Sequence, residues 1–314
     1  MNYLTHFHFD NIPFPVDEKY NYFYPRKSSL KIIDELSNLC RFHNGVFVIE
    51  GSQGIGKSVL LNKFIEKIQN NDFVISIKAN EKTDILKVIA NKLNVDAKNI
   101  ENIFDALNSI YATGQNIIIV IDDAHNLSKM QMISISSLIS VVKHLKIILC
   151  GTNELKKKIK NKSLIELRKA IIKKYKIKHF SFFECVKYIS YVSNSATALS
   201  QYKKVIPFPS LVLLGLFTNR NMHNINHIIT DALKDAFKHN KNHLKVKNVY
   251  HSMKKNFDMV KENIYLKFQK FFFYILILLS LYFAFKIISD RYDLITSLEA
   301  QKSIMLQEKE LMEN

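Results

Sequence analysis

Eight consecutive residues read Gly51-Ser52-Gln53-Gly54-Ile55-Gly56-Lys57-Ser58, the pattern G-x-x-x-x-G-K-[ST] of a phosphate-binding loop. A short apolar run of strand type, residues 46–50, comes directly before them, and residues 59–70 carry apolar side chains at helical spacing. In a glycine loop between a strand and a helix, backbone N–H groups converge on an anion, and the helix N-terminus adds partial positive charge. The stretch therefore predicts a site for a nucleoside triphosphate.

The residue types of this loop have distinct expected roles. Gly51, Gly54 and Gly56 let the backbone approach the phosphates closely. Lys57 is expected to reach the β- and γ-phosphates, and the hydroxyl group of Ser58 is expected to bind Mg²⁺. The expected cofactors are therefore ATP and Mg²⁺.

A second motif lies at residues 116–123, where an apolar run ends in the two carboxylates of Asp122 and Asp123. It fits the Walker B pattern, because a continuous β-branched run indicates a strand buried on both faces. Asp122 is expected to hold Mg²⁺ through water, and Asp123 stands where many P-loop ATPases carry the glutamate that polarises the attacking water. The alternative is a pair of solvated acids that end a strand.

A third polar stretch, Gly151-Thr152-Asn153, follows the apolar strand expected at 145–150. If this strand lies between those at 46–50 and 116–121, a side chain at its tip can touch the γ-phosphate or its water. Asn153 is the candidate sensor, with Thr152 as a substitute. The alternative is a simple N-cap for a helix that starts near Glu154.

The order of elements indicates an α/β core followed by helices. Strands are expected at 46–50, 73–78, 116–121, 145–150 and 175–180, with helices between them and helices at 182–199, 210–217, 222–237 and 246–255. This order favours a five-stranded parallel sheet over residues 1–180 and an α-helical lid over 181–262. The aromatic opening, residues 7–25, is expected to pack on the nucleotide domain.

A long apolar segment follows the predicted lid. Residues 271–285 carry no charge, and the run continues to 288, so that 18 residues span about 27 Å, close to a bilayer core of about 30 Å. Lysines precede the segment, and residues 289–314 hold three basic and six acidic side chains. The positive-inside rule therefore predicts one transmembrane helix at 271–288, a cytoplasmic N-terminal body and a periplasmic tail at 289–314. A buried core helix is the alternative.

The charge balance allows two kinds of partner. The net charge of +17 suits nucleic acid or an anionic membrane surface. Only five of the 45 basic residues are arginines, which favours a general lysine excess over base-specific recognition. The lysine-rich run 156–162 is interpreted as a solvated face. The three scattered cysteines are expected to be buried thiols in a reducing compartment.

Several short stretches follow one another in a recognisable order around Walker A. They are Phe9-Asp10-Asn11-Ile12-Pro13-Phe14, Ile121-Asp122-Asp123-Ala124-His125-Asn126-Leu127, Gly151-Thr152-Asn153-Glu154-Leu155, Tyr188-Ile189 and Ile225-Asn226. Over residues 1–240 the chain resembles AAA+ ATPases of the general-secretion-pathway A (ExeA) and MSHA-pilus biogenesis types. The resemblance implies a P-loop AAA+ (ASCE) core, a homo-oligomer, and a cytosolic ATPase that serves an envelope-spanning secretion, pilus or DNA-uptake machine.

The chain departs from this family at three positions. The family's catalytic glutamate is Asp123 here, and its arginine finger falls on Ala170, with Arg168 two residues before it. Its second-sensor arginine falls on His223, with Arg220 three residues before. Because the carboxylate of Asp123 is one methylene shorter, we expect nucleotide binding to be intact and hydrolysis to be slow, with Arg168 as the candidate finger.

Two functions from different classes follow from these patterns. The favoured one is a single-pass AAA+ ATPase of the bacterial inner membrane that supports a type II secretion, type IV pilus or DNA-uptake apparatus. The alternative is a DNA-associated AAA+ regulator of the transposition or replication-initiation type, with nucleic acid as its partner. A nucleotide switch that binds but hardly turns over is a third. The apolar segment 271–288 discriminates, because a DNA-loading ATPase has little need of a bilayer anchor.

Overall fold

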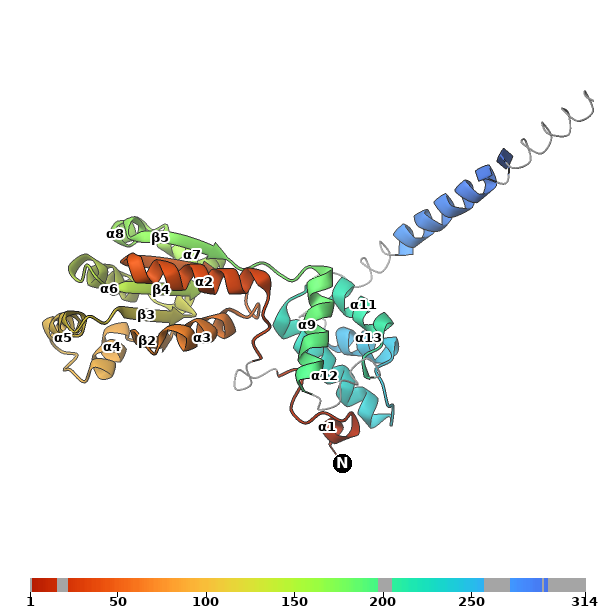
Figure 1. Ribbon diagram of the computed structural model, residues 1–314, viewed down its shortest axis with the longest axis horizontal. Coiled ribbons are helices and arrows are strands. Elements are labelled where there is room, and N and C mark those ends of the chain that lie inside the picture. Colours follow the sequence, from red (N-terminus) through yellow and green to blue (C-terminus); the bar gives the residue numbers. More distant parts are fainter. Residues whose placement is uncertain (1, 16–21, 197–204, 257–271, 290, 293–314) are drawn as a thin grey trace, which may run out of the picture. The chain divides into compact units, whose positions relative to one another are not determined.

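The computed structural model describes residues 2–15, 22–196, 205–256, 272–289 and 291–292. The chain divides into two compact units, Met1–Met259 and Val260–Asn314. The first unit holds a parallel sheet with its covering helices and a set of further helices (Figure 1).

The sheet has five parallel strands in the order β2-β3-β4-β1-β5. Their bounds are β1 Gly45–Glu50, β2 Phe73–Lys78, β3 Ile117–Asp122, β4 Lys146–Gly151 and β5 Ile171–Lys176. The three central strands are buried along almost their whole length, as their continuous apolar runs predict. The expected five-stranded parallel α/β sheet is confirmed, and β4 lies between β1 and β3 as the sensor argument requires.

Strand β5 is the element that the sequence placed wrongly. A strand was expected at 175–180, whereas β5 runs from Ile171 to Lys176 and pairs with β1 at the edge of the sheet. An edge strand has one covered side, and in β5 only Tyr175 is fully buried among exposed lysines. Strand β5 therefore lacks the continuous apolar run by which the other strands were predicted.

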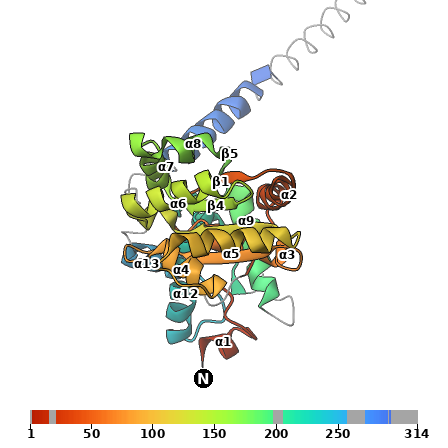
Figure 2. The ribbon, with the colours of Figure 1, turned by 90° about the vertical axis from the view of Figure 1, so that its left-hand side faces the viewer.

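Two layers of helices cover the sheet, because successive strand residues point to opposite faces. Phe47 and Ile49 of β1 pack with α2 (Lys27–Phe42) and α3 (Lys57–Ile68), whereas Val46 and Val48 face the other layer. That layer contains α4 Ile85–Leu93, α5 Ile100–Ala112, α6 Lys129–Val141, α7 Asn153–Ile159 and α8 Ile165–Lys169. In Figure 2, α2 and α3 lie to the right of the strands and α6 and α7 to the left.

The helices after the sheet occupy the range predicted for a lid, and we call them the lid. They are α9 Phe182–Ser195, α11 Phe208–Phe217, α12 Met222–Lys238 and α13 Val246–Lys255. Helix α9 begins with a capping box, in which Ser181 and Glu184 bond each other's backbone N–H groups. Helix α12 packs against α13, and α9 against α11. Residues 197–204 and 257–262 of the predicted lid lie outside the described residues.

Residues 2–15 of the N-terminal segment pack on the lid, which the sequence did not predict, whereas Phe23 packs against the core formed by the sheet with α2 and α3, as expected. Phe7, Phe9 and Phe14 are buried, and the short helix α1 (Tyr3–His6) contacts α12. From α12, Asn226 Nδ2 donates to the carbonyl of Pro15 at 3.0 Å, and Thr230 Oγ1 donates to the carbonyl of Phe14 at 2.9 Å. These bonds satisfy backbone groups that an irregular segment leaves unpaired.

The second unit contains one long apolar helix, Phe272–Ser289. Its 18 residues have a mean hydropathy of 2.1, and none of this window is buried within the structure. By length and composition this helix can cross a membrane. Phe271 and most of the predicted tail at 289–314 lie outside the described residues.

Candidate nucleotide site

The P-loop joins the carboxyl end of β1 to the first turn of α3, and its glycines have the backbone that the motif requires. Gly54 and Gly56 have φ values of 72° and 93°, in the left-handed region that favours glycine. A Cβ atom at Gly54 would lie 2.5 Å from the Cβ atom of His223. The loop can therefore lie directly against the lid only because Gly54 has no side chain.

Lys57 lies over the loop rather than in solvent. Its side chain is buried, and its Nζ donates to the carbonyl of Ser52 at 3.1 Å. The ammonium group is thus held above the arc of the loop, where it can bind phosphate oxygens. Ser58 follows it in the first turn of α3 and is half-buried.

The two carboxylates that end β3 lie at the same edge of the sheet as the P-loop. Asp122 Oδ1 accepts a hydrogen bond from the backbone N–H of Asp123 at 2.8 Å. Burial and the neighbouring Asp122 raise the pKa of Asp123, whereas His125 and Lys57 act in the opposite direction. Asp122, Asp123 and Lys57 are therefore close enough to act on one another electrostatically.

The donor set fits Mg²⁺. This ion is usually bound by one or two carboxylates together with substrate phosphates and water, and Ser58 and Asp122 would supply the protein's part. Within the described residues no group of three or more His, Cys, Asp or Glu side chains could hold a metal alone. A site completed by nucleotide phosphates is consistent with that finding.

Asp123 has an unusual backbone conformation, with a φ of 52°. Aspartate and asparagine tolerate the left-handed region better than other non-glycine residues. The 3₁₀ turn Ala124–Asn126 follows directly, and the Nδ1 atom of His125 lies 4.0 Å from Oδ1 of Asp123. This turn fixes the direction of the Asp123 side chain.

Lys158 holds the turn in place. From α7, its Nζ donates to the carbonyl groups of His125 and of Leu127, the latter at 2.8 Å. The sequence interpretation of 156–162 as a solvated face is therefore wrong for Lys158, which is half-buried. The sequence could not distinguish Lys158 from the other lysines of the run, because its partners lie more than 30 residues away in the chain.

The two sensor candidates lie at the start of α7, and the candidate arginine finger lies in α8. Thr152 is the N-cap of α7 and accepts from the backbone N–H of Glu154, so the capping alternative applies to it. Asn153 is the first residue of α7 and is exposed. Arg168 is exposed in α8, near the amino end of β5, so that the length of β5 separates it from the P-loop edge.

The turn that begins α12 contacts the P-loop directly. Asn221 Nδ2 donates to the carbonyl of Gln53 at 2.5 Å, and the backbone N–H of His223 donates to the carbonyl of Gly54 at 3.0 Å. Burial, followed by the nearby His227, lowers the pKa of His223, which favours a neutral ring at neutral pH. His223 thus lies against the P-loop without the positive charge that an arginine would bring.

A small apolar hollow lies beside Gly56, and no sequence pattern predicted it. Its walls come from the N-terminal segment, the P-loop helix and the lid, and include Phe23, Tyr24, Ile55, Val59, Ile177, Phe180 and Met222. Its volume is about 20 Å³, which is room for about one water molecule, so these side chains pack against one another rather than leaving space for a purine base.

Arg26 connects the N-terminal segment to the lid at this hollow. Its guanidinium group binds the carboxylate of Glu184 with Nε–Oε1 at 2.6 Å and lies 5.4 Å from the ring centre of Phe180. Ser52 of the P-loop and His179 form a second tie, with Oγ and Nε2 at 2.9 Å. Because these contacts are long-range in sequence, no local pattern could have revealed them.

Comparisons with known proteins agree with this geometry. Residues 40–159 match the family model described as AAA domain. No curated protein sequence matches the chain.

Among solved structures, Cdc6p from Pyrobaculum aerophilum has a TM-score of 0.60 at 15% identity, covering 76% of this chain and 70% of its own. The Aeropyrum pernix ORC1 protein in complex with DNA has a TM-score of 0.58 at 11% identity, covering 78% and 68%. The Thermotoga maritima RuvB Holliday junction branch migration motor has a TM-score of 0.52 at 13% identity, covering 78% and 73%. Residues 40–159 are thus similar to the AAA domain family in sequence, and the fold is that of the AAA+ P-loop ATPases.

Proposed function

We propose that the chain is a membrane-anchored AAA+ ATPase of the bacterial inner membrane that supports a type II secretion, type IV pilus or DNA-uptake apparatus. The observation that carries this proposal is the presence, in one chain, of a nucleotide site and an unburied apolar helix. The site brings Lys57, Asp122 and Asp123 together, and Phe272–Ser289 is long enough to span a bilayer. The order of short motifs that resembles the secretion ATPases supports the choice of machine.

The proposed chemistry is slow hydrolysis of ATP. Mg²⁺ would supply charge neutralisation of the phosphates when bound between Ser58, Asp122 and the nucleotide. Asp123 then orients a water molecule and accepts its proton, and Lys57 stabilises the charge on the phosphate oxygens. The short carboxylate of Asp123 and the neutral ring of His223 both weaken this arrangement.

We further propose that the chain acts as a homo-oligomer. Arg168 is exposed and lies across the length of β5 from its own P-loop. An arginine in that place can reach a γ-phosphate only on a neighbouring copy, as trans-acting arginine fingers do. The apparatus protein that meets this oligomer is expected to contribute to its assembly.

Replacing Asp123 by Asn should separate binding from hydrolysis. Positioned general bases contribute roughly 10²-fold to 10⁴-fold to a rate, so Asp123→Asn should lower ATP turnover by about 100-fold and leave ATP affinity within about twofold. Because the pKa of Asp123 is raised, turnover of the unmodified chain should begin to fall at a higher pH than for an ordinary carboxylate as the solution is acidified. Phosphate release by the full chain in detergent measures the turnover of the variant and the pH dependence of the unmodified chain. An unchanged rate in Asp123→Asn would exclude Asp123 as the general base.

Removing the Lys158 ammonium group should loosen the turn that carries Asp123. A charged hydrogen bond contributes about 1.5–3 kcal/mol, so Lys158→Met should lower turnover about tenfold or more with little change in KM. Lys158→Arg should restore part of the rate, whereas Lys156→Met, an exposed change in the same helix, should leave the rate unchanged. Equal losses in the two methionine variants would mean that Lys158 does not position Asp123.

A DNA-associated AAA+ regulator is the second candidate. The net charge of +17 favours it, as does the similarity in fold to the ORC1 protein that was solved with DNA. This function makes no use of the apolar helix in the second unit. The location of that helix therefore decides between the two functions.

Topology is tested by reporter fusions to the full chain. Alkaline phosphatase fused after Asn314 should be active, because the fusion point would lie in the periplasm, where its disulfides form. The same enzyme fused after Lys255 should be inactive, and this fusion serves as the internal control. An inactive fusion after Asn314, or a chain that stays in the soluble fraction after cell lysis, would favour the DNA-associated function instead.

A further inference from the structure

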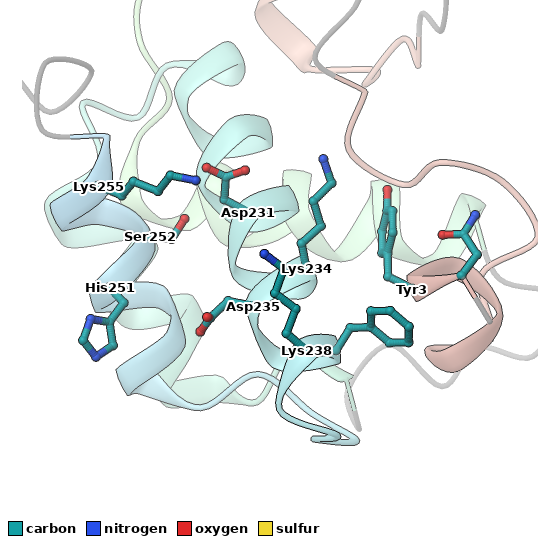
Figure 3. Close-up of a pocket in the computed structure, with 10 residues that line it drawn as sticks. Tyr3, Asp231, Lys234, Asp235, Lys238, His251, Ser252 and Lys255 are labelled. Carbon is teal, nitrogen blue, oxygen red and sulfur yellow. The ribbon is translucent and has the colours of Figure 1, made fainter.

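A second hollow lies in the lid, between α1, α12 and α13 (Figure 3). Its volume is about 430 Å³, within the usual range of roughly 300–1,000 Å³ for small-molecule sites. None of its lining residues belongs to the P-loop, to the Asp122–Asp123 pair or to the turn at Asn221. The nucleotide site therefore does not explain this hollow.

Three lysines line the hollow and have no carboxylate partner among the described residues. Lys234 and Lys238 lie one turn apart on α12, and Lys255 extends toward α12 from α13 (Figure 3). In the parts of the chain that the structure describes, no carboxylate lies within 4.0 Å of any of these three ammonium groups. Three unpaired positive charges beside a concave surface favour an anionic ligand.

The two aspartates of the hollow are already engaged. Asn256 Nδ2 donates to Asp231 Oδ2 at 2.9 Å, and Asn248 Nδ2 donates to Asp235 Oδ2 at 2.8 Å. The Nδ1 atom of His227 also lies 3.7 Å from Asp231 Oδ2, and the Nδ1 atom of His239 lies 3.6 Å from Asp235 Oδ1. The aspartates thus hold α13 against α12, which leaves the longer lysine side chains to meet a ligand.

The remaining wall is aromatic. Tyr3 of α1 and Phe237 of α12 line the hollow, and both are half-buried. Lysine ammonium groups bind phosphate as point charges, and aromatic rings favour apolar substituents. The combination suits a ligand that carries a phosphate and an apolar group side by side.

We propose that the lid hollow binds a phosphate ester with an apolar substituent, and that its source is the headgroup region of an anionic phospholipid. Lys255 lies 17 residues before Phe272, and a fully extended chain of that length spans at most about 60 Å, so that the lid stays within reach of a bilayer that holds the apolar helix. The lipid source rests on the proposed membrane anchor. The phosphate chemistry of the hollow does not.

The test measures binding of three soluble probes to the full chain in a neutral detergent, with Mg²⁺ and ADP at saturation so that the P-loop is filled. The probes are dihexanoyl phosphatidylglycerol, glycerol 3-phosphate and dihexanoyl phosphatidylcholine. The variant Lys234→Gln/Lys238→Gln/Lys255→Gln should bind the phosphatidylglycerol about tenfold or more weakly than the unmodified chain. Lys187→Gln/Lys247→Gln/Lys254→Gln removes the same charge from exposed lid positions outside the hollow and should change the affinity by less than about twofold.

The outcomes separate the ligand source from the site. Binding of phosphatidylglycerol but not phosphatidylcholine, lost only in the hollow variant, supports the proposal with its lipid source. Tight binding of glycerol 3-phosphate, lost in the same variant, supports the phosphate site but overturns the lipid source. Equal losses in both variants, or no binding of any of the three probes, overturns the site. Lys57→Ala, measured in parallel without nucleotide, should retain probe binding, so that failure of the nucleotide site is distinguished from failure of the hollow.

Discussion

The contact between the P-loop and the turn that begins α12 is the interaction on which the nucleotide site depends. Carbonyl groups of Gln53 and Gly54 accept hydrogen bonds from Asn221 and His223, and the absent side chain of Gly54 leaves the room for them. The same backbone whose N–H groups would receive phosphate thus presents its carbonyl groups to the lid. A ligand that changes the loop therefore acts on the position of α12, provided that it binds the two arrangements with different affinity.

The lid also contacts the N-terminal segment. Helix α12 bonds to Phe14 and Pro15, and Arg26 binds Glu184 at the start of α9. The lid helices thus contact the P-loop, the small apolar hollow beside Gly56 and the N-terminal segment. In the proposed function, these helices would convert the nucleotide state into a movement that a membrane partner can detect.

Sequence patterns predicted the parts of the site that are local in the chain. The glycine loop at 51–58 and the carboxylates that begin at Asp122 each follow an apolar strand. This arrangement predicted a parallel sheet with both motifs at the carboxyl ends of its strands. Contacts between distant residues could not be found in this way. Lys158 looks like one of several surface lysines until α7 is seen beside the turn after β3, and β5 is hidden because an edge strand needs few apolar residues.

The left-handed backbone of Asp123 was equally invisible to the sequence, and it gives a physical reason for an aspartate where the resembled family has glutamate. In the proposed function, the P-loop binds ATP with Mg²⁺ through Lys57. Isothermal titration calorimetry of the full chain in detergent tests it most directly, with Lys63→Ala as a control at an exposed lysine of the same helix. We expect one ATP site per chain, whose affinity falls at least about tenfold in Lys57→Ala and not in the control. Equal affinity in Lys57→Ala and the unmodified chain would contradict it.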